Sequence, residues 1–132
     1  MSSADTVRSL LARSDEFLTS AKDNLSRGHN NVACFDADQA VQILLKANIF
    51  KLAGSFPRTH SLRRLLSELG RLAKKDTDVR KFISDNRATI TMLEDAYLRS
   101  RYATEPYDAS DAGTCLKTAR EVIKFVKAIA AV

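Results

Sequence analysis

Apolar residues recur at three- and four-residue steps through almost the whole of this 132-residue sequence. Leu62, Leu65, Leu66 and Leu69 are one such run. This periodicity places the apolar side chains on one face of an α-helix, whereas a half-buried strand needs strict alternation. Only 4 glycines and 2 prolines occur, so the residues that punctuate β-proteins are scarce. The pattern therefore predicts an all-α fold.

Capping and stop residues divide this pattern into five predicted helices. They are expected to begin at Asp5, at Asn30 or Asn31, at Thr59 or Ser61, at Asp76, and at Ser110 or Asp111. The helix from Asp76 is expected to run unbroken to about Arg101 or Tyr102, and the third helix is expected to be the shortest. We therefore expect an up-down helical bundle of four long helices and one shorter helix, in a single domain over residues 1–132.

Nothing in the sequence points to a membrane, a cofactor or a metal. The first residues lack a basic stretch followed by an apolar run, and no segment approaches the roughly 20 apolar residues of a membrane span. A cytoplasmic location is therefore expected. Cys34 and Cys115 stand far apart without CxxC spacing, and only His29 and His60 are available as further soft ligands. We expect two buried free thiols and no metal site.

The net charge of +5 is concentrated in one segment. Between Arg58 and Lys81, eight basic residues meet only three acidic ones. Such a basic segment attracts RNA, a nucleotide or an acidic protein partner through a field that salt screens. A solvated helix face beside a lysine-rich turn explains the same residues without a ligand.

The stretch from Tyr97 to Tyr107 sets two arginines and three tyrosines where a helix runs into a turn broken by Pro106. An arginine fork suits phosphate or carboxylate, and a tyrosine adds stacking area and a hydroxyl. The stretch therefore resembles a phosphate- or nucleotide-facing site. Its candidate binding residues, with two from the basic segment, are Arg99, Arg101, Tyr102, Tyr107, Arg63 and Arg64.

Arg101 is the better functional candidate of the two arginines. Asp95 precedes Arg99 by four residues, the spacing of a helical ion pair, whereas no acid stands in that position for Arg101. A structural alternative has Arg101 bonding the last carbonyls of its helix or pairing with Glu105. Tyrosines near helix ends are also commonly core-edge packers.

His60 is the only histidine near the arginine-rich region and is a candidate general base. Its place at a helix start instead favours hydrogen bonding to helix N-terminal groups or packing on a neighbouring helix.

In three segments taken together, the chain resembles the HEPN domain family over nearly its whole length. They are Cys34 to Val41 leading to Lys46 and Ala47, Thr59 to Leu62 with Leu65 and Leu66, and Tyr97 to Tyr107. The resemblance implies a helical bundle that forms a homodimer, with Arg101 lining a shared cleft. It also implies RNA or nucleotide binding and a toxin-antitoxin pairing with a minimal nucleotidyltransferase, which in some pairs modifies a tyrosine next to the motif.

Many family members are metal-independent ribonucleases with a histidine four to six residues after the arginine. In this sequence the positions four to seven residues after Arg101 hold Glu105, Pro106, Tyr107 and Asp108 instead. An unperturbed tyrosine has a pKa of about 10 and is a poor base near neutral pH. We therefore expect a binding subunit rather than a competent nuclease. The alternative is a ribonuclease toxin in which Arg101 and Tyr107 are catalytic, and a third possibility is a purely structural assembly domain.

Overall fold

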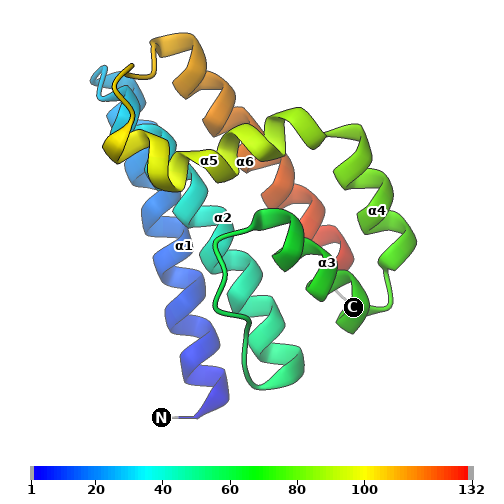
Figure 1. Cartoon of the computed structure of the whole chain (residues 1–132). Helices are drawn as coiled ribbons and strands as arrows, with labels where there is room; N and C mark the ends of the chain where they lie inside the picture. The colour runs from blue at the N-terminus through cyan, green and yellow to red at the C-terminus, as the bar shows by residue number, and fades with distance from the viewer. Residues whose placement is uncertain (1, 131–132) are drawn as a thin grey trace.

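The computed structural model describes residues 2–130 and is built from α-helices (Figure 1). In chain order these are α1 (Ser3–Ser26), α2 (Asn30–Ala53), α3 (Leu62–Ala73), α4 (Asp76–Asp85), α5 (Arg87–Tyr102) and α6 (Ala109–Ala130). The predicted all-α bundle is confirmed, with one helix more than expected. Within the described residues, no helix combines the length and apolar character that a bilayer span requires.

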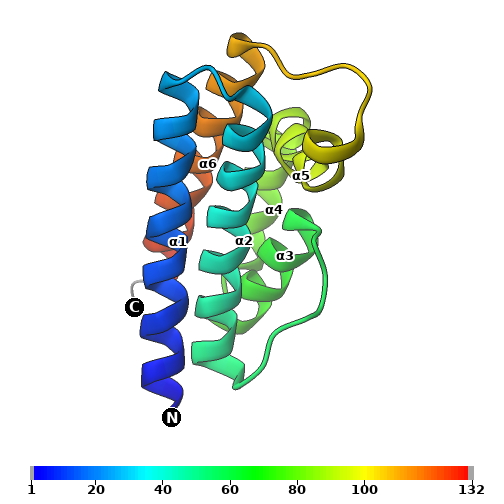
Figure 2. The same ribbon diagram turned by 90° about the vertical axis from the view of Figure 1, so that its left-hand side faces the viewer.

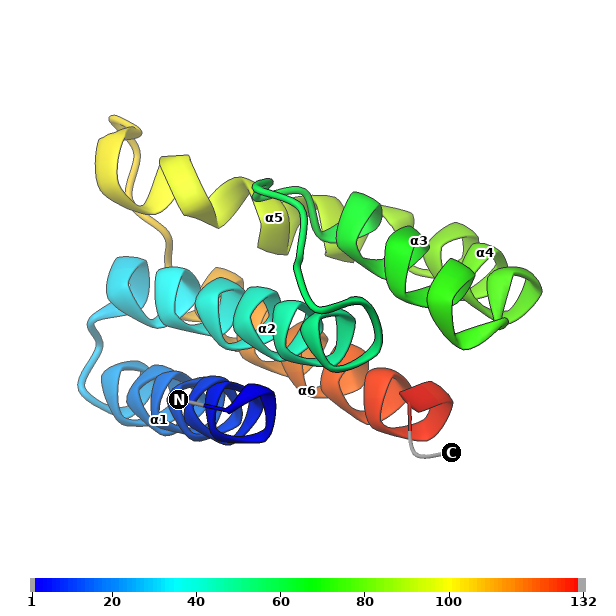
Figure 3. The same ribbon diagram turned by 90° about the horizontal axis from the view of Figure 1, so that it is seen from below.

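The helices form two layers, with α1, α2 and α6 in one and α3, α4 and α5 in the other (Figure 3). The central helix α2 packs against α1, α3, α5 and α6. Helices α1 and α2 run antiparallel, joined by a tight turn in which Gly28 has φ of 75° (Figure 2). Glycine adopts this left-handed conformation without steric strain, so Gly28 is well suited to the position just after the end of α1.

Small residues along α2 let its neighbours approach closely. Ala33, Ala37 and Ala40 are all buried, and the Ser14 hydroxyl on α1 donates a 2.7 Å hydrogen bond to the carbonyl of Ala40. The rest of the core is aliphatic. Its largest fully buried apolar side chains are Val41, Leu45, Ile49, Leu62, Leu65, Leu66, Leu69, Val79, Ile90, Leu93 and Val122.

The expected long helix from Asp76 to about Tyr102 is wrong, because it is broken at Asn86 into α4 and α5. Asn86 has φ of −124° and ψ of 21°, and its side-chain amide donates a 2.9 Å hydrogen bond to the carbonyl of Phe82. A short polar side chain that competes for backbone groups in this way weakens a helix interior. The break lets α5 leave α4 at an angle and cross the bundle (Figure 1).

An extended segment connects α2 to α3 and carries His60 to the face of α5. Gly54 ends α2 with φ of 78°, after which the chain runs back along the outside of the bundle (Figure 2). The Ser61 hydroxyl accepts a hydrogen bond from the backbone N–H of Arg64 at 3.2 Å and caps α3, as one of the two expected caps. Residues distant in sequence thereby meet beside α5.

Other expected caps shift by a few residues. Ser2, not Asp5, caps α1, and its hydroxyl accepts a hydrogen bond from the Asp5 backbone N–H. Helix α6 begins one residue before Ser110, and Asp108 and Asp111 bond each other's backbone N–H groups at its start. The N-cap of α2 is His29, which makes no side-chain cap bond, and the amide oxygen of Asn31 accepts a 2.8 Å hydrogen bond from the backbone N–H of Tyr107.

Candidate functional site

Arg101 lies near the C-terminal end of α5 among aromatic rings. Its guanidinium carbon is 4.6 Å from the ring centre of Tyr97, 4.9 Å from that of Tyr102 and 5.2 Å from that of Phe35 on α2. These distances allow cation–π attraction between the guanidinium and each ring. His60 completes the group, since its ring stacks on Tyr97 with centres 3.6 Å apart. We call these five residues the Arg101 cluster.

The charge of Arg101 has no acidic partner. The guanidinium donates to the carbonyl of Tyr97, one turn back in the same helix, from Nε at 2.9 Å and also from a terminal nitrogen. None of the ion pairs among residues 2–130 includes Arg101, so the alternative pairing with Glu105 is not seen. The exposed guanidinium therefore keeps a full positive charge and further donors toward solvent.

His60 packs on the neighbouring helix α5, one of the two structural roles that its sequence position favours. Its Nδ1 lies 3.4 Å from the side-chain oxygen of Gln42 on α2. Partial burial, together with the positive charges of Lys46 and Arg101, lowers the pKa of His60 below its usual value. The imidazole is therefore neutral at pH 7 and able to accept a proton.

A buried polar row on α2 supports this end of the cluster, and sequence reasoning missed it. Asp38 is 0% exposed and accepts a 2.7 Å hydrogen bond from the amide of Gln42. Burial raises the pKa of Asp38 to about 8, and burial also lowers the pKa of Lys46 nearby. The detectable signal was the recurrence of Asp38, Gln42 and Lys46 every four residues, which places three polar side chains on one face of α2.

Tyr107 and Arg99 form a separate contact. The Arg99 guanidinium is 5.9 Å from the ring centre of Tyr107, and the Asp95–Arg99 ion pair expected from sequence is absent in the described chain. The Tyr107 hydroxyl is buried without a hydrogen-bond partner. Burial, with smaller effects from the neighbouring cysteines, raises the pKa of Tyr107 to about 12. Tyr102, in contrast, is 73% exposed.

Arg63 and Arg64 lie at the start of α3 and do not contact the Arg101 cluster. Arg63 pairs with Glu94 on α5 at 3.5 Å, and its backbone N–H also faces that carboxylate. Arg64 is exposed and has no ion pair among residues 2–130. Between these arginines and the cluster lies a pocket of about 530 Å³ whose lining includes His60, Tyr97 and Glu94.

The two cysteines are free and buried, as expected. Cys34 on α2 and Cys115 on α6 are close enough for a thiol hydrogen bond, which, with burial, raises the pKa of Cys34. A raised pKa keeps the thiol protonated and makes it a poor nucleophile. Within residues 2–130, no group of three or more His, Cys, Asp or Glu side chains is arranged to hold a metal ion.

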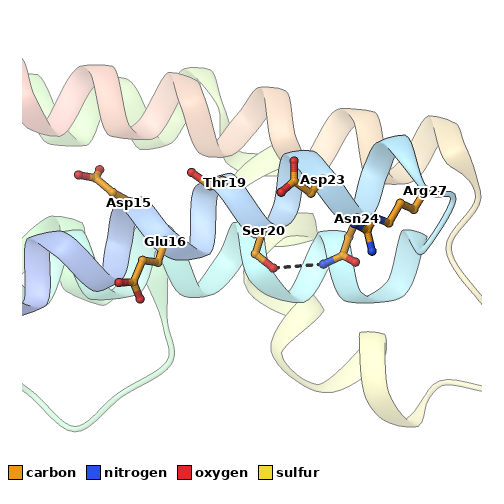
Figure 4. A pocket seen from close by; sticks show the side chains of 7 residues that line it. All are labelled: Asp15, Glu16, Thr19, Ser20, Asp23, Asn24 and Arg27. Carbon is orange, nitrogen blue, oxygen red and sulfur yellow. Dashed lines mark hydrogen bonds between the residues drawn. The ribbon is translucent and has the colours of Figure 1, made fainter.

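A second hollow of about 530 Å³ runs along α1 (Figure 4). Asp15, Glu16 and Asp23 line it, and their negative charges disfavour a phosphate ligand. Its amide and hydroxyl groups serve the helix junction, because Ser20 and Asn24 both donate to the carboxylate of Asp36 on α2. This hollow is therefore not assigned to the site.

Comparison with known proteins identifies the family. A family model described as the HEPN domain matches residues 7–129. The chain belongs to the HEPN domain family. Among solved structures, this HEPN protein is similar to the protein TT1696 from Thermus thermophilus, with a TM-score of 0.76 and 26% sequence identity over 93% of this chain and 97% of that one. No curated protein matches the sequence.

The histidine that the family resemblance leads one to expect after Arg101 is missing, but the fold brings another histidine close to Arg101. The loop after Arg101 supplies no histidine, but the connection between α2 and α3 brings His60 onto the same tyrosine ring that Arg101 contacts. Local sequence spacing does not reveal this proximity, because His60 and Arg101 are 41 positions apart along the chain.

Proposed function

We propose that this HEPN-domain protein binds a nucleotide or RNA through the Arg101 cluster, as a subunit that works with a nucleotidyltransferase partner. One observation carries the proposal: an exposed guanidinium without an acidic partner lies among three aromatic rings. A guanidinium fork binds phosphate oxygens, and an exposed ring such as that of Tyr102 offers a surface on which a base stacks. The cluster thus supplies both contacts that a nucleotide needs.

A homodimer built on the outer face of α5 strengthens such a site. Leu98 and Tyr102 stand one turn apart on this helix and are 58% and 73% exposed. Pairing two copies through this face covers apolar area and brings two Arg101 side chains near each other. Two close guanidinium groups repel unless an anion lies between them. A dimer therefore favours a phosphate ligand more strongly than one protomer does.

The nucleotidyltransferase partner is expected to meet the same face. Tyr102 is the tyrosine next to Arg101 with an accessible side chain, whereas the hydroxyl of Tyr107 is buried. We expect nucleotide transfer by such a partner to label Tyr102 and to disappear in Tyr102→Phe. Mass spectrometry of the modified protein measures this, and a label on Tyr107 would contradict the assignment.

The direct test measures binding of labelled RNA and of labelled ATP in EDTA to wild type, Arg101→Ala and the control Arg120→Ala on α6. Losing charged hydrogen bonds to phosphate is expected to weaken binding by about 10- to 100-fold in Arg101→Ala only. Equal affinity of the two variants would remove the cluster as the binding site. Comparing the affinities for RNA and for ATP shows whether the cluster prefers a nucleic-acid strand or a free nucleotide.

A second candidate function is a metal-independent ribonuclease. A base role for Tyr107 is disfavoured, because a pKa of about 12 keeps its hydroxyl protonated at neutral pH. The observation that favours cleavage is the stacking of neutral His60 on Tyr97, whose ring also contacts Arg101. On this reading, cleavage in the same samples is lost in Arg101→Ala and His60→Ala and retained in Tyr107→Phe. Intact RNA with wild type would leave binding alone as the function.

A further inference from the structure

A pocket of about 630 Å³ on the other end of α5 is lined by four arginines. Arg63 and Arg64 come from the start of α3, Arg80 from α4 and Arg87 from the start of α5. Ser61 and Ser67 add hydroxyl groups, and no acidic residue lines the pocket. We call it the arginine pocket. Arg80 and Arg87 stand on either side of the break at Asn86, and both line this one hollow.

The positive charge of the arginine pocket is largely uncompensated. Arg64, Arg80 and Arg87 form no ion pair in the described part of the chain, and Arg63 has only the long 3.5 Å contact with Glu94. The Nε of Arg63 is also buried without a hydrogen-bond partner. Convergent guanidinium groups repel one another, so their arrangement is favourable when an anion with several oxygens lies between them.

Helix stability does not explain Arg87. It is the first residue of α5, where the helix dipole disfavours a positive side chain and favours a negative one. Arg87 is nevertheless exposed and without an ion-pair partner among residues 2–130. A bound anion would account for a basic residue in this place.

The arginine pocket is continuous with the Arg101 cluster. Ser61 lines both the arginine pocket and the pocket that holds His60 and Tyr97. Glu94 lines the latter and pairs with Arg63 of the former. The two basic sites are therefore neighbours along the same side of α5.

The surface between the arginine pocket and the Arg101 cluster differs from both in its chemistry. It contains the ring of Tyr97, the exposed Leu98, the side chain of Arg99 and the carboxylates of Glu94 and Asp95. Apolar and aromatic groups there suit the face of a base, and the two acids offset the charge of Arg99 and disfavour phosphate. Phosphate-binding groups thus stand at the two ends, with a base-compatible surface between them.

We propose that the arginine pocket holds backbone phosphates of a single-stranded nucleic acid whose other end contacts the Arg101 cluster. This inference rests on the proposed function and specifies its ligand as a strand rather than a mononucleotide. Arg87 and Arg101 are fourteen residues apart on α5, which at the rise of an α-helix is about 21 Å. Only a chain of several nucleotides reaches both sites.

The test compares wild type with Arg80→Ala/Arg87→Ala, using labelled single-stranded RNA of about 12 nucleotides and of about 3 nucleotides. Arg13→Ala/Arg120→Ala, on α1 and α6, is the control with the same change in charge. Fluorescence anisotropy gives the dissociation constants over a range of salt concentrations, and circular dichroism verifies that each variant is folded. Alanine is a good helix former, so both pairs are expected to fold.

For the long RNA, the Arg80→Ala/Arg87→Ala pair is expected to weaken binding at least tenfold. Its slope of log affinity against log salt should become shallower by about 1.4, because two phosphate contacts are lost. Binding of the short RNA should be unchanged. If the long RNA binds this pair and the control pair equally well, the arginine pocket is not a phosphate site.

Two further measurements distinguish a failure of this inference from a failure of the proposed function. Arg101→Ala should weaken the binding of both RNAs. If it weakens the binding of neither, while Arg80→Ala/Arg87→Ala weakens binding of the long RNA, the arginine pocket is a phosphate site. In that case the proposal that one strand contacts both sites is overturned. Inorganic tripolyphosphate distinguishes the source of the phosphate. If it binds as tightly as the long RNA, the ligand is a free polyanion and the strand assignment fails.

Discussion

Asp38 places a carboxyl group in the interior of the bundle, where its protonation is linked to folding. The side chain is 0% exposed, one oxygen accepts from Gln42, and the other has no partner. Removing a carboxylate from water favours its protonated form, which is why the pKa of Asp38 rises to about 8. The folded protein therefore retains a proton that the unfolded chain releases near pH 4.

The first prediction concerns Asp38→Asn. Between about pH 4 and pH 8 the folded wild type binds one proton more at Asp38 than the unfolded chain. The contribution of Asp38 to the free energy of unfolding therefore falls as pH rises, by up to about 1.4 kcal/mol per pH unit. The fall ends above pH 8, where both states are ionised at this residue. Asp38→Asn lacks this contribution, so its stability should rise relative to wild type over the same range. Urea denaturation at several pH values measures it, and a pH-independent difference would show that Asp38 is already ionised.

The residues of the Arg101 cluster were predictable from the sequence to different degrees. Arg101 was a candidate because arginine and tyrosine together suit a phosphate or nucleotide, and because no acid stands four residues before it. The partners Phe35 and His60 were not, since each belongs to a distant segment and reaches the cluster only through tertiary packing. The separation of Tyr107 from Arg101 likewise depends on the bond that Asn31 makes to the loop.

Gly70 shows how a single residue sets the distance between two helices. A Cβ atom at this position on α3 would lie 2.7 Å from the Cγ2 and 3.0 Å from the Cβ of Val79 on α4. Val79 is itself buried, so it has little room to move. The missing side chain at Gly70 therefore permits close packing of α3 on α4.

The second prediction is that Gly70→Ala destabilises the protein. Better helix propensity contributes about 1 kcal/mol, but the forced contact with Val79 costs about 1 to 3 kcal/mol, so a net loss is expected. Gly113→Ala in α6 is the matched control, because a Cβ there meets nothing within 4 Å and should stabilise by up to about 1 kcal/mol. Thermal and urea unfolding measure both. Equal stabilisation by the two substitutions would mean that α4 moves away freely.

Most helices were predictable from periodicity, and the α4–α5 break was not. Gly28 and Gly54 adopt left-handed conformations and end their helices as their positions indicated. Asn86 gave a much weaker signal, because asparagine also occurs within helices at a modest energetic cost. The error matters, since the break turns α5 across the bundle (Figure 1), and Arg101 lies near the far end of this helix.

The exposed apolar side chains on α5 bear on whether the protein forms a dimer. The third prediction is that Leu98→Asp shifts the protein from dimer to monomer, because it places a charge in the proposed interface on α5. Leu52→Asp at the end of α2 is the control, since Leu52 is similarly exposed at 50% but lies outside that face. Light scattering coupled to size-exclusion chromatography measures the mass. A wild type that is monomeric at every concentration would contradict the dimer.

The bundle as a whole followed from its apolar pattern, since burying one stripe per helix leaves few other arrangements. The pattern carries no information about which exposed face meets a partner, because a surface side chain contributes equally well to solvent contact and to an interface.

The orientation of the chain has a practical consequence. The first turn of α1 and the last turn of α6 point toward one end of the molecule, and the 103–108 loop beside the Arg101 cluster lies at the other (Figure 2). Attachment to a sensor chip through the first turn of α1 or the last turn of α6 therefore presents the cluster to the flowing solution. Kinetic measurements on tethered protein can then be made without the support masking the surface that they are meant to probe.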